Sequence, residues 1–464
     1  MKPSSGKPFL IVIAAVAVLA TLSLIPWSRL TGGQIKDFSL LSDITGGSDS
    51  DSAPAMSTEL VDPELAEALA HAEAEPETAS RASRSSDADS VVAPSVLKDA
   101  VNPRQGDAVI FEDYTAAGQG LANLRRALAD KSRTARIAFI GDSYIEGDIL
   151  TQNIRKLLQD RFGGSGVGYM PLSSMVANFR TSVRQSSNGW TEHDIRKKSS
   201  DAYKWLSGEY FTSSAKASST FKGSSKLPHL GSWDSTSLLF ISPSSGSVSI
   251  TTDAGTRQFP VQGSDAVQCL SVPGNTKSAT ITSEIPGLQA LAAYLDGTGG
   301  IAVDNMSLRG NSGITHRKIN PDLISQMRRF RDYDLIVLEF GINALTAEQS
   351  NYNGYRSIMV KVLNRIRQCY PNADILLMGI GDRGHKVNGQ VKSLATAPNM
   401  VAAQRDAARK AGVLFWDTRE AMGGEDAVVS WRDRGLINAD YIHLNSKGGA
   451  VLADEFVKSL NLAL

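Results

Sequence analysis

Two separate parts of the chain alternate short apolar strands with amphipathic helices, and this alternation constrains the fold more than any other feature. Residues 135–140 predict a buried strand, and a helix with apolar side chains at three- and four-residue spacing follows from Ile149 to Phe162. The remaining expected elements are strands at 335–340, 374–380 and 413–416 and helices at 121–129, 355–369, 398–411 and 447–460. Such alternation predicts a parallel sheet covered by helices on both faces.

A β-rich block separates these two parts. Between residues 171 and 303, short apolar stretches such as 237–241, 246–251 and 278–281 are divided by turns rich in Ser, Gly, Asn and Asp. This pattern is typical of a small antiparallel β-sandwich. We therefore expect a β-sandwich that is inserted into one loop of an α/β domain.

Residues 1–30 predict a membrane anchor. Lys2 and Lys7 precede an uncharged run at 9–27, and roughly 20 apolar residues are enough to cross a bilayer as a helix. The positive flank favours a cytoplasmic amino terminus, which places the rest of the chain on the outer, periplasmic side of the inner membrane. The alternative is a cleaved signal peptide and secretion to the periplasm, although no small-x-small cleavage site follows Trp27.

Residues 31–105 differ in composition from the rest of the chain. Ser, Ala, Asp and Glu dominate, and fourteen acidic residues stand against five basic ones. A stretch this poor in apolar residues cannot bury enough surface to offset the entropy that ordering costs. It is predicted to be a disordered acidic linker between the anchor and the folded part.

Charge and cysteine content exclude several classes of protein. The 464 residues carry 48 basic and 48 acidic side chains, and this balance argues against a nucleic-acid-binding protein. Cys269 and Cys369 are the only cysteines, which is too few for a zinc knuckle, an iron–sulfur centre or a disulfide framework. A cysteine-based metal centre is therefore not expected.

A nucleophile is suggested by Gly141-Asp142-Ser143, which directly follows the first predicted strand. A serine there lies at the carboxyl edge of a parallel sheet, where open α/β folds bind their ligands. Its backbone N–H, near the start of a helix, can help to stabilise an oxyanion. An ordinary turn also accounts for an isolated Gly-Asp-Ser, so the position after a buried strand carries the interpretation.

A general base is suggested by His443, which follows Asp440 by three residues just ahead of the last predicted helix. In one tight loop the carboxylate of Asp440 can reach Nδ1 of the imidazole, which leaves Nε2 to take the proton of a serine. The alternative is an aspartate that caps a turn beside an exposed histidine.

Two further motifs follow other apolar segments. Asn343 closes Phe340-Gly341-Ile342-Asn343 at the end of a predicted strand, where its amide could donate to an oxyanion. The run Gly310-Asn311-Ser312-Gly313 offers a backbone N–H that no side chain covers. Each motif alone is a common turn.

Taken in order, these motifs resemble the four blocks of the SGNH/GDSL hydrolase family. The matching residues are Gly141-Asp142-Ser143, Gly313, Gly341-Ile342-Asn343 and Asp440-Tyr441-Ile442-His443. The resemblance implies a flavodoxin-like three-layer α/β/α hydrolase domain with a parallel sheet, in two parts at 106–171 and 301–464. Members hydrolyse or transfer acyl esters without a metal, and the resemblance therefore implies that no metal or other cofactor takes part.

The resemblance also implies a role for each residue. Ser143 would be the nucleophile, His443 the general base and Asp440 the acid that orients the histidine. The oxyanion hole would consist of the Ser143 N–H, Gly313 and Asn343, with Gly310 as the rival for the glycine role.

The long gap between Ser143 and Gly313 is similar to the peptidoglycan O-acetylesterase branch of this family. There a carbohydrate-module-like sandwich interrupts the catalytic domain, which implies such a module at 172–300. The runs 141–148 and 166–169 are similar to that branch as well.

This similarity implies a serine esterase that removes O-acetyl groups from a cell-envelope polysaccharide, with O-acetylated peptidoglycan the leading substrate. One alternative is a polysaccharide O-acetyltransferase that uses the same Ser-His-Asp site. Another is a non-catalytic glycan-binding envelope protein.

Aromatic side chains in the insert are candidate sugar contacts. Trp190, Trp205 and Trp233 could present their ring faces to a glycan, or they could instead fill the core of the sandwich. Arg383, in the loop after the strand at 374–380, is a candidate substrate contact near the active edge of the sheet.

Overall fold

The computed structural model describes residues 104–197 and 201–464, all of which belong to one compact unit, Glu59–Leu464. The expected membrane segment at 9–27 and nearly all of the expected linker lie outside the described residues. Within the described ranges, no helix has the length and apolar character needed to span a bilayer.

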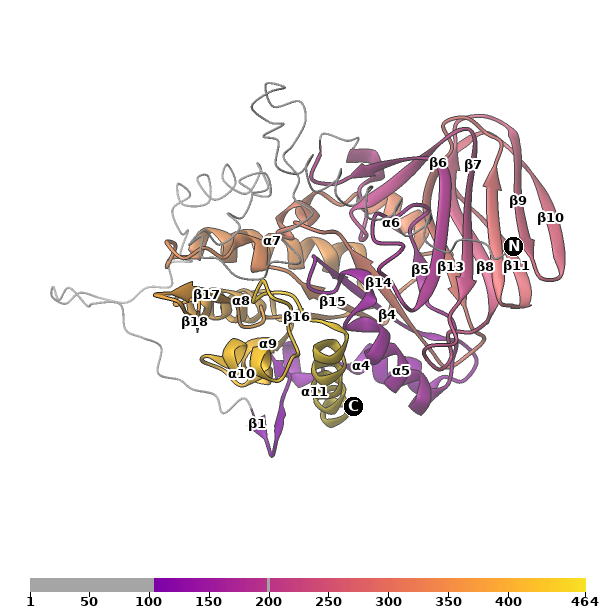
Figure 1. Ribbon diagram of the computed structural model, residues 1–464. Helices are drawn as coiled ribbons and strands as arrows, with labels where there is room; N and C mark the ends of the chain where they lie inside the picture. Colours follow the sequence, from indigo (N-terminus) through magenta and orange to yellow (C-terminus); the bar gives the residue numbers. More distant parts are fainter. Residues whose placement is uncertain (1–103, 198–200) are drawn as a thin grey trace, which may run out of the picture. The chain divides into compact units, whose positions relative to one another are not determined.

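A six-stranded sheet forms the centre of the α/β part, in the order β14-β4-β15-β16-β19-β3 (Figure 1). Its strands are β3 (Glu112–Asp113), β4 (Ala135–Gly141), β14 (Ile301–Ser307), β15 (Leu335–Glu339), β16 (Asp374–Met378) and β19 (Leu414–Trp416). The strands β14, β4, β15, β16 and β19 are parallel to one another, and β3 at the edge is antiparallel to β19. In chain order the parallel strands read 2-1-3-4-5, which is the flavodoxin-like order. The predicted parallel α/β fold is confirmed.

Helices cover both faces of this sheet. They are α4 (Ala122–Ala129), α5 (Thr151–Phe162), α6 (Pro321–Met327), α7 (Asn353–Cys369), α8 (Ala397–Ala411), α9 (Thr418–Met422), α10 (Ala427–Asp433) and α11 (Ser446–Ala463). One apolar core joins α6, α7 and α8 to one face of the strands, through residues such as Ile140 and Leu338. A second core joins α4, α5 and α11 to the other face, through residues such as Phe139 and Val337. Alternate strand residues therefore serve opposite faces, as the pleat requires.

The inserted part is a single antiparallel sheet of nine strands. They are β5 (Gly168–Met170), β6 (Val183–Asp194), β7 (Glu209–Gly223), β8 (Trp233–Ser242), β9 (Gly246–Thr252), β10 (Gly255–Val261), β11 (Ser264–Thr276), β12 (Ser278–Ser283) and β13 (Gln289–Asp296). One apolar core unites residues from β7, β8, β9, β12 and β13, so the sheet folds over on itself. The strands thus enclose a core as in a sandwich, but their hydrogen bonding is continuous and does not divide them into two sheets.

The sheet of the insert begins earlier than the expected boundary at 172. Strand β5 pairs with β13, with Tyr169 opposite Tyr294. A buried carboxylate from the α/β part, Asp304 on β14, fixes this join because it accepts hydrogen bonds from the Tyr169 N–H (3.0 Å) and from Arg331. The guanidinium of Arg331 also lies over the ring of Tyr294, at 4.2 Å from its centroid.

Shorter elements connect these layers. They are β1 (Arg104–Gln105), β2 (Ala108–Val109), β17 (Gly384–Val387), β18 (Gln390–Ser393) and the 3₁₀ turns η2 (Ala116–Gly118), η3 (Glu146–Asp148), η4 (Asp201–Tyr203), η5 (Ile314–Lys318) and η6 (Ile342–Ala344). The turns η3, η5 and η6 follow β4, β14 and β15, and they form the edge of the sheet to which the predicted motifs map.

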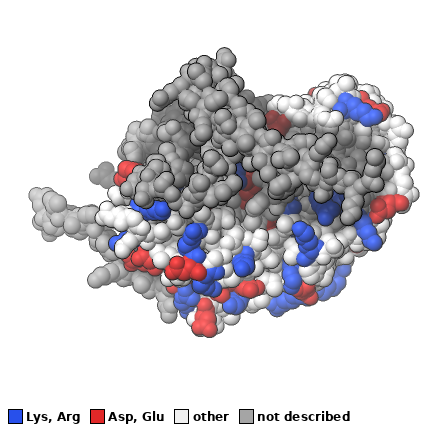
Figure 2. All heavy atoms as spheres, in the orientation of Figure 1, with Lys and Arg blue, Asp and Glu red and all other residues white. Residues whose placement is uncertain are grey.

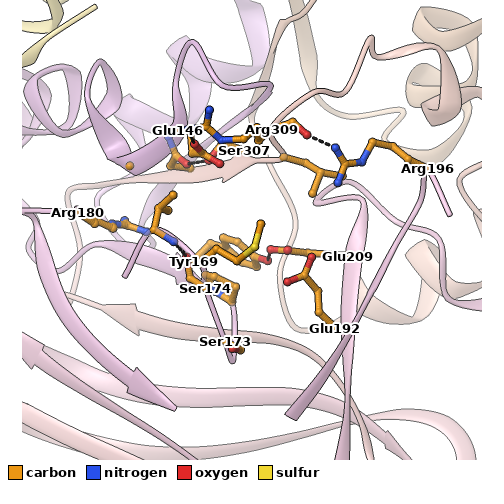
Figure 3. Close-up of a pocket in the computed structure, with 16 residues that line it drawn as sticks. Glu146, Tyr169, Ser173, Ser174, Arg180, Glu192, Arg196, Glu209, Ser307 and Arg309 are labelled. Carbon is orange, nitrogen blue, oxygen red and sulfur yellow. Dashed lines mark hydrogen bonds and ion pairs between the residues drawn. The ribbon is translucent and has the colours of Figure 1, made fainter. Parts of the chain in front are cut away.

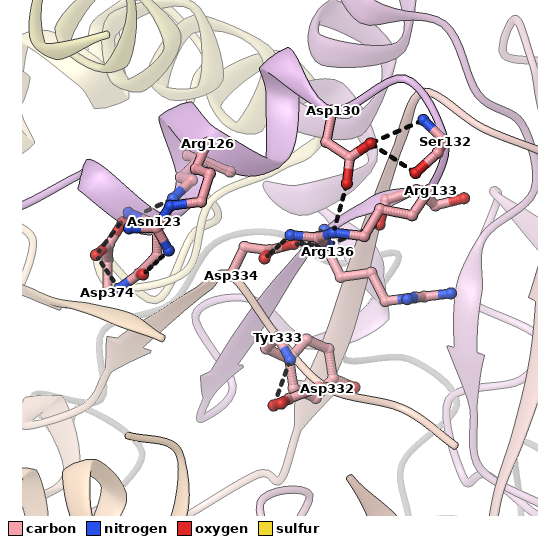
Figure 4. A network of polar contacts seen from close by, with 12 residues as sticks. Asn123, Arg126, Asp130, Ser132, Arg133, Arg136, Asp332, Tyr333, Asp334 and Asp374 are labelled. Atoms are coloured by element: carbon pink, nitrogen blue, oxygen red, sulfur yellow. Dashed lines mark hydrogen bonds and ion pairs between the residues drawn. The ribbon is translucent and has the colours of Figure 1, made fainter. Parts of the chain in front are cut away.

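Carboxylates fasten the opposite edge of the sheet, where the strands begin (Figure 4). Asp374 accepts hydrogen bonds from the backbone N–H groups of Asn123 (3.3 Å) and Leu124 (2.9 Å) at the start of α4. Asp334 accepts a two-pronged contact from Arg133 at 2.7 and 2.9 Å. On the face seen in Figure 2, Lys and Arg alternate with Asp and Glu over the described surface, so neither sign of charge dominates there.

Candidate active site

Three neighbouring strands bring the predicted motifs to one edge. Gly141 at the end of β4 pairs with Ser307 of β14 on one side and with Glu339 of β15 on the other. The loops that carry Ser143, Gly310 to Gly313 and Asn343 start within a few residues of these positions. From β4 the chain crosses first to β14 and later to β15 on the opposite side, so this edge is the topological switch point at which open α/β sheets bind ligands.

Ser143, His443 and Asp440 form a continuous hydrogen-bonded chain. The hydroxyl of Ser143 lies 2.8 Å from Nε2 of His443, and Nδ1 of the same ring lies 2.8 Å from Oδ2 of Asp440. In the tautomer with the proton on Nδ1, the imidazole donates to Asp440 and accepts from the serine. This arrangement prepares Nε2 to take the serine proton.

The loop 440–443 is tightly closed. Oδ1 of Asp440 accepts hydrogen bonds from the backbone N–H groups of Ile442 and His443, both at 3.0 Å, and Tyr441 adopts a left-handed backbone conformation with φ of 59°. Partial burial favours the neutral acid, but the hydrogen bonds from the His443 ring and the two N–H groups outweigh it and lower the pKa of Asp440 to about 2. Asp440 is therefore ionised at any pH near neutrality.

A second carboxylate lies directly beneath the nucleophile. Asp142 is fully buried, and it accepts hydrogen bonds from the Tyr144 N–H (2.9 Å) and from Nδ2 of Asn343 (2.8 Å). Burial raises its pKa to about 7. Glu339, at the end of β15, is buried next to it, and burial together with the Asp142 charge raises the pKa of Glu339 well above its ordinary value.

The Asp142–Glu339 pair was not predicted from the sequence. The carboxyl group of Glu339 has the backbone N–H and the side chain of Asp142 as its hydrogen-bonding neighbours. A Cβ at Gly141 would lie 3.0 Å from Oε2 of Glu339, so this carboxyl group packs against the strand that leads to Ser143. The one sequence feature that could have indicated this pair is Glu339 itself, an acidic residue near the end of the apolar run 335–340.

The amide of Asn343 is already engaged. Its Nδ2 donates to Oδ2 of Asp142 and to the carbonyl oxygen of Asn311, at 2.8 and 3.1 Å. Both N–H groups are thus in use, and donation to an oxyanion requires one contact to be exchanged. The longer contact, to Asn311, is the weaker of the two.

The geometry disfavours Gly313 as the oxyanion glycine. Its N–H donates to Oδ1 of Asn311 at 2.9 Å, and a Cβ there would lie 2.6 Å from the ring of Phe340. With φ of 84°, Gly313 serves a left-handed turn packed against that ring. In the described part of the chain, the N–H groups of Gly310 and Ser143 have no acceptor. Gly310 is therefore the better candidate.

The expectation that Trp205 and Trp233 contact substrate is wrong, because both side chains lie in the interior. Their exposed fractions are 0% and 1%. The indole of Trp205 donates to the carbonyl of Glu209 at 2.7 Å, and that of Trp233 donates to Oγ1 of Thr236 at 2.8 Å. Trp190 is half-buried and packs against the core of the insert.

Arg383 contacts the loop that carries Asn343. Its Nη1 donates to the carbonyl oxygens of Leu345 (2.9 Å) and Ile342 (3.3 Å). The next residue, Gly384, donates its N–H to the carbonyl of Tyr441 at 2.9 Å. This segment therefore connects the Asn343 loop to the His443 loop. A contact between Arg383 and substrate stays a prediction.

The sheet order and the residues at its carboxyl edge define the SGNH/GDSL α/β hydrolase fold. Among residues 104–197 and 201–464, no three His, Cys, Asp or Glu side chains are grouped to hold a metal ion. The GDSL-like lipase/acylhydrolase family model matches residues 274–451. The matched segment includes Asn343, Asp440 and His443 but not Ser143, because the insert separates the nucleophile from the other motifs.

A solved structure shows the same fold. A peptidoglycan O-acetylesterase is similar with a TM-score of 0.62 and 23% identity, over 76% of this chain and 99% of that one. The two predicted hydrolase segments make up about half of the chain, so this match extends into the insert. The predicted resemblance to SGNH/GDSL hydrolases, and to this branch of them, is confirmed.

Other similar structures match at lower scores. A family two carbohydrate esterase from Cellvibrio japonicus has a TM-score of 0.27 and 10% identity, over 61% of this chain and 98% of that one. A salicylyl-acyltransferase from a tetracycline biosynthetic pathway has a TM-score of 0.28 and 12% identity, over 61% and 97% of the two chains. No curated protein matches the sequence.

Proposed function

We propose that this chain is a serine esterase that removes O-acetyl groups from a cell-envelope polysaccharide, most directly peptidoglycan. The observation that carries the proposal is the 2.8 Å contact between Ser143 and Nε2 of His443, with Asp440 on the other ring nitrogen. The fold shared with a peptidoglycan O-acetylesterase supports the choice of substrate.

The reaction follows from this arrangement. Oγ of Ser143 attacks the acetyl carbonyl carbon while its proton passes to Nε2 of His443. The tetrahedral intermediate collapses, the bond to the sugar oxygen breaks, and His443 returns the proton to the departing sugar hydroxyl. Water then attacks the acetyl group on Ser143, again giving a proton to Nε2, and acetate leaves as the serine is restored.

Charge that develops on the carbonyl oxygen needs donors. The Ser143 N–H, the Gly310 N–H and the Asn343 amide come from three neighbouring strand ends and form the proposed oxyanion hole. Asn343 joins it by exchanging its 3.1 Å contact with the Asn311 carbonyl for the oxyanion.

We also propose that the chain acts on the periplasmic side of the inner membrane. The support is the apolar run at 9–27 with lysines before it, and the acidic stretch 31–105 would act as the tether. Release to the periplasm after cleavage would leave the same domain in the same compartment.

Acetate release from O-acetylated peptidoglycan by the full-length chain tests the proposal. Ser143→Ala is the inactivating variant, and Ser244→Ala, at an exposed serine after β8, is the matched control. We expect release by the wild type and the control, and none by Ser143→Ala. Transfer of acetyl to another sugar without acetate release would identify an acetyltransferase, and glycan binding without either reaction would identify a binding protein.

A further inference from the structure

A pocket lies between the α/β part and the insert, next to the candidate active site (Figure 3). One wall comes from Glu146 in η3 and from Ser307 to Arg309 at the end of β14. The other comes from Tyr169, Glu192 and Glu209 of the insert. Glu146 is three residues after Ser143, and Arg309 directly precedes Gly310. The pocket thus adjoins the loops that carry Ser143 and Gly310.

The pocket is small. Its cavity volume is about 60 Å³. A cavity needs roughly 10–15 Å³ on the same measure to hold one water molecule, so this cavity admits a small group of several atoms. A substituent of a sugar is a group of this kind.

Two carboxyl groups of the insert lie on one side of this cavity, across from Glu146, Ser307 and Arg309 (Figure 3). Glu209 on β7 is nine-tenths buried, and its Oε1 accepts a hydrogen bond from the Tyr169 hydroxyl at 2.8 Å. Within the described residues, Oε2 of Glu209 and the carboxyl group of Glu192 on β6 have no hydrogen-bond partner. The pocket thus contains polar atoms that a ligand can satisfy.

These two acids differ in what they can offer. Burial, and then the neighbouring charge of Glu192, raise the pKa of Glu209 to about 8. Glu209 is therefore mainly protonated at neutral pH, and Oε2 can donate a hydrogen bond. Glu192 has a pKa raised by burial and by Asp194, and it remains an acceptor whenever it is ionised.

The other lining groups complete the chemistry. Arg309 forms an ion pair with Glu146, so the facing wall adds no uncompensated positive charge. Met175, Val176 and Leu308 supply apolar surface. Arg180 and Arg196 also line the cavity, and they pair with Asp148 and Asp194.

Apart from serine hydroxyls, the pocket therefore presents a donor from Glu209, an acceptor from Glu192 and an apolar patch. A ligand carboxylate does not suit it, because Glu192 and Glu209 already lie there.

We propose that this pocket binds the acetamido group of an N-acetylated amino sugar that carries, or adjoins, the O-acetyl ester. The carbonyl of the acetamide accepts from Glu209, its N–H donates to Glu192, and its methyl group contacts the apolar patch. This inference rests on the proposed esterase function. It separates glycans built from N-acetylated amino sugars from neutral acetylated glycans such as xylan.

Binding measured with full-length Ser143→Ala tests the inference without turnover. The probes are a chito-oligosaccharide and its de-N-acetylated counterpart of equal length, compared by titration calorimetry. We expect the N-acetylated probe to bind about tenfold more tightly, as one or two added hydrogen bonds would give. Equal affinities, or tighter binding of the amine, would overturn the acetamido assignment.

Variants of the two pocket acids test whether the preference for the N-acetylated probe arises in this pocket. Glu192→Ala and Glu209→Leu, each made in the Ser143→Ala background, should reduce the tenfold ratio to about two or less. Glu284→Gln, at an exposed glutamate of the same insert, should leave it unchanged. A ratio that survives both pocket variants would overturn the proposal. Ser143-dependent cleavage of an aryl acetate by the wild type reports separately on the esterase.

Discussion

Nε2 of His443 lies 2.8 Å from Oγ of Ser143, although 300 residues separate the two along the chain. The approach depends on how closely α11 packs against the segment before α5. A Cβ at Gly449, near the start of α11, would lie 2.3 Å from the carbonyl oxygen of Ile149. Only glycine permits this distance, and it brings the loop that ends in His443 to the carboxyl edge of β4.

Asn343→Ala should lower turnover on an acetyl ester by about 100- to 1000-fold, because one oxyanion donor is lost. The KM should change far less than kcat, since the donor acts on charge that develops in the transition state. Steady-state hydrolysis of an aryl acetate measures both constants. Asn364→Ala, at an exposed asparagine of α7, is the matched control. Turnover close to that of the wild type would remove Asn343 from the oxyanion hole.

Trp233→Ala should lower the free energy of unfolding by about 3–5 kcal/mol, because a buried aromatic ring is replaced by a cavity. The indole also loses its hydrogen bond to Thr236. Urea denaturation measures the effect, and binding of a glycan to the folded fraction should be unaffected. Normal stability combined with lost glycan binding would restore the role in sugar contact that the sequence suggested.

The buried pair Asp142 and Glu339 should make stability depend on pH. Both groups have a pKa above the value of an unfolded acid, so the folded state binds more protons. The free energy of unfolding should therefore fall as pH rises from about 4 through 7, by about 1.4 kcal/mol per pH unit for each such proton.

Glu339→Gln removes one of these protons, so the slope should become shallower by about 1.4 kcal/mol per pH unit. Urea titrations of the wild type and the variant over this range measure the difference. Glu284→Gln should keep the wild-type slope, because Glu284 is exposed. Identical slopes for the wild type and Glu339→Gln would show that Glu339 is ionised in the folded protein.

The α/β part and the hydrogen-bonded set Ser143, His443 and Asp440 could be predicted from the sequence for a local reason. The periodicity of a strand or helix can be seen within a single segment of the sequence, and Asp440 and His443 belong to one loop. The position of β14 beside β4 could not be predicted, because this pairing joins segments more than 150 residues apart. The sequence indicated that the segment before Gly310 is apolar, but not that it is a strand of this sheet.

Other details depended on tertiary contacts that no local pattern records. Gly310 and Gly313 lie in one loop, and only the side chain of Asn311 distinguishes their N–H groups. Tryptophan is a residue type that often contacts sugar rings, yet Trp205 and Trp233 both pack inside the protein. In the sequence, Glu339 is an ordinary polar residue at the end of a strand. Its pairing with Asp142 becomes visible only in the folded structure.

Trapping the acetyl-enzyme tests the central claim most directly. The full-length chain is mixed with an aryl acetate, quenched in acid, digested and analysed by mass spectrometry. We expect a peptide that contains Ser143 to carry one added acetyl group, and no such adduct in Ser143→Ala. Acetylation of another residue, or ester cleavage that persists in Ser143→Ala, would contradict the account.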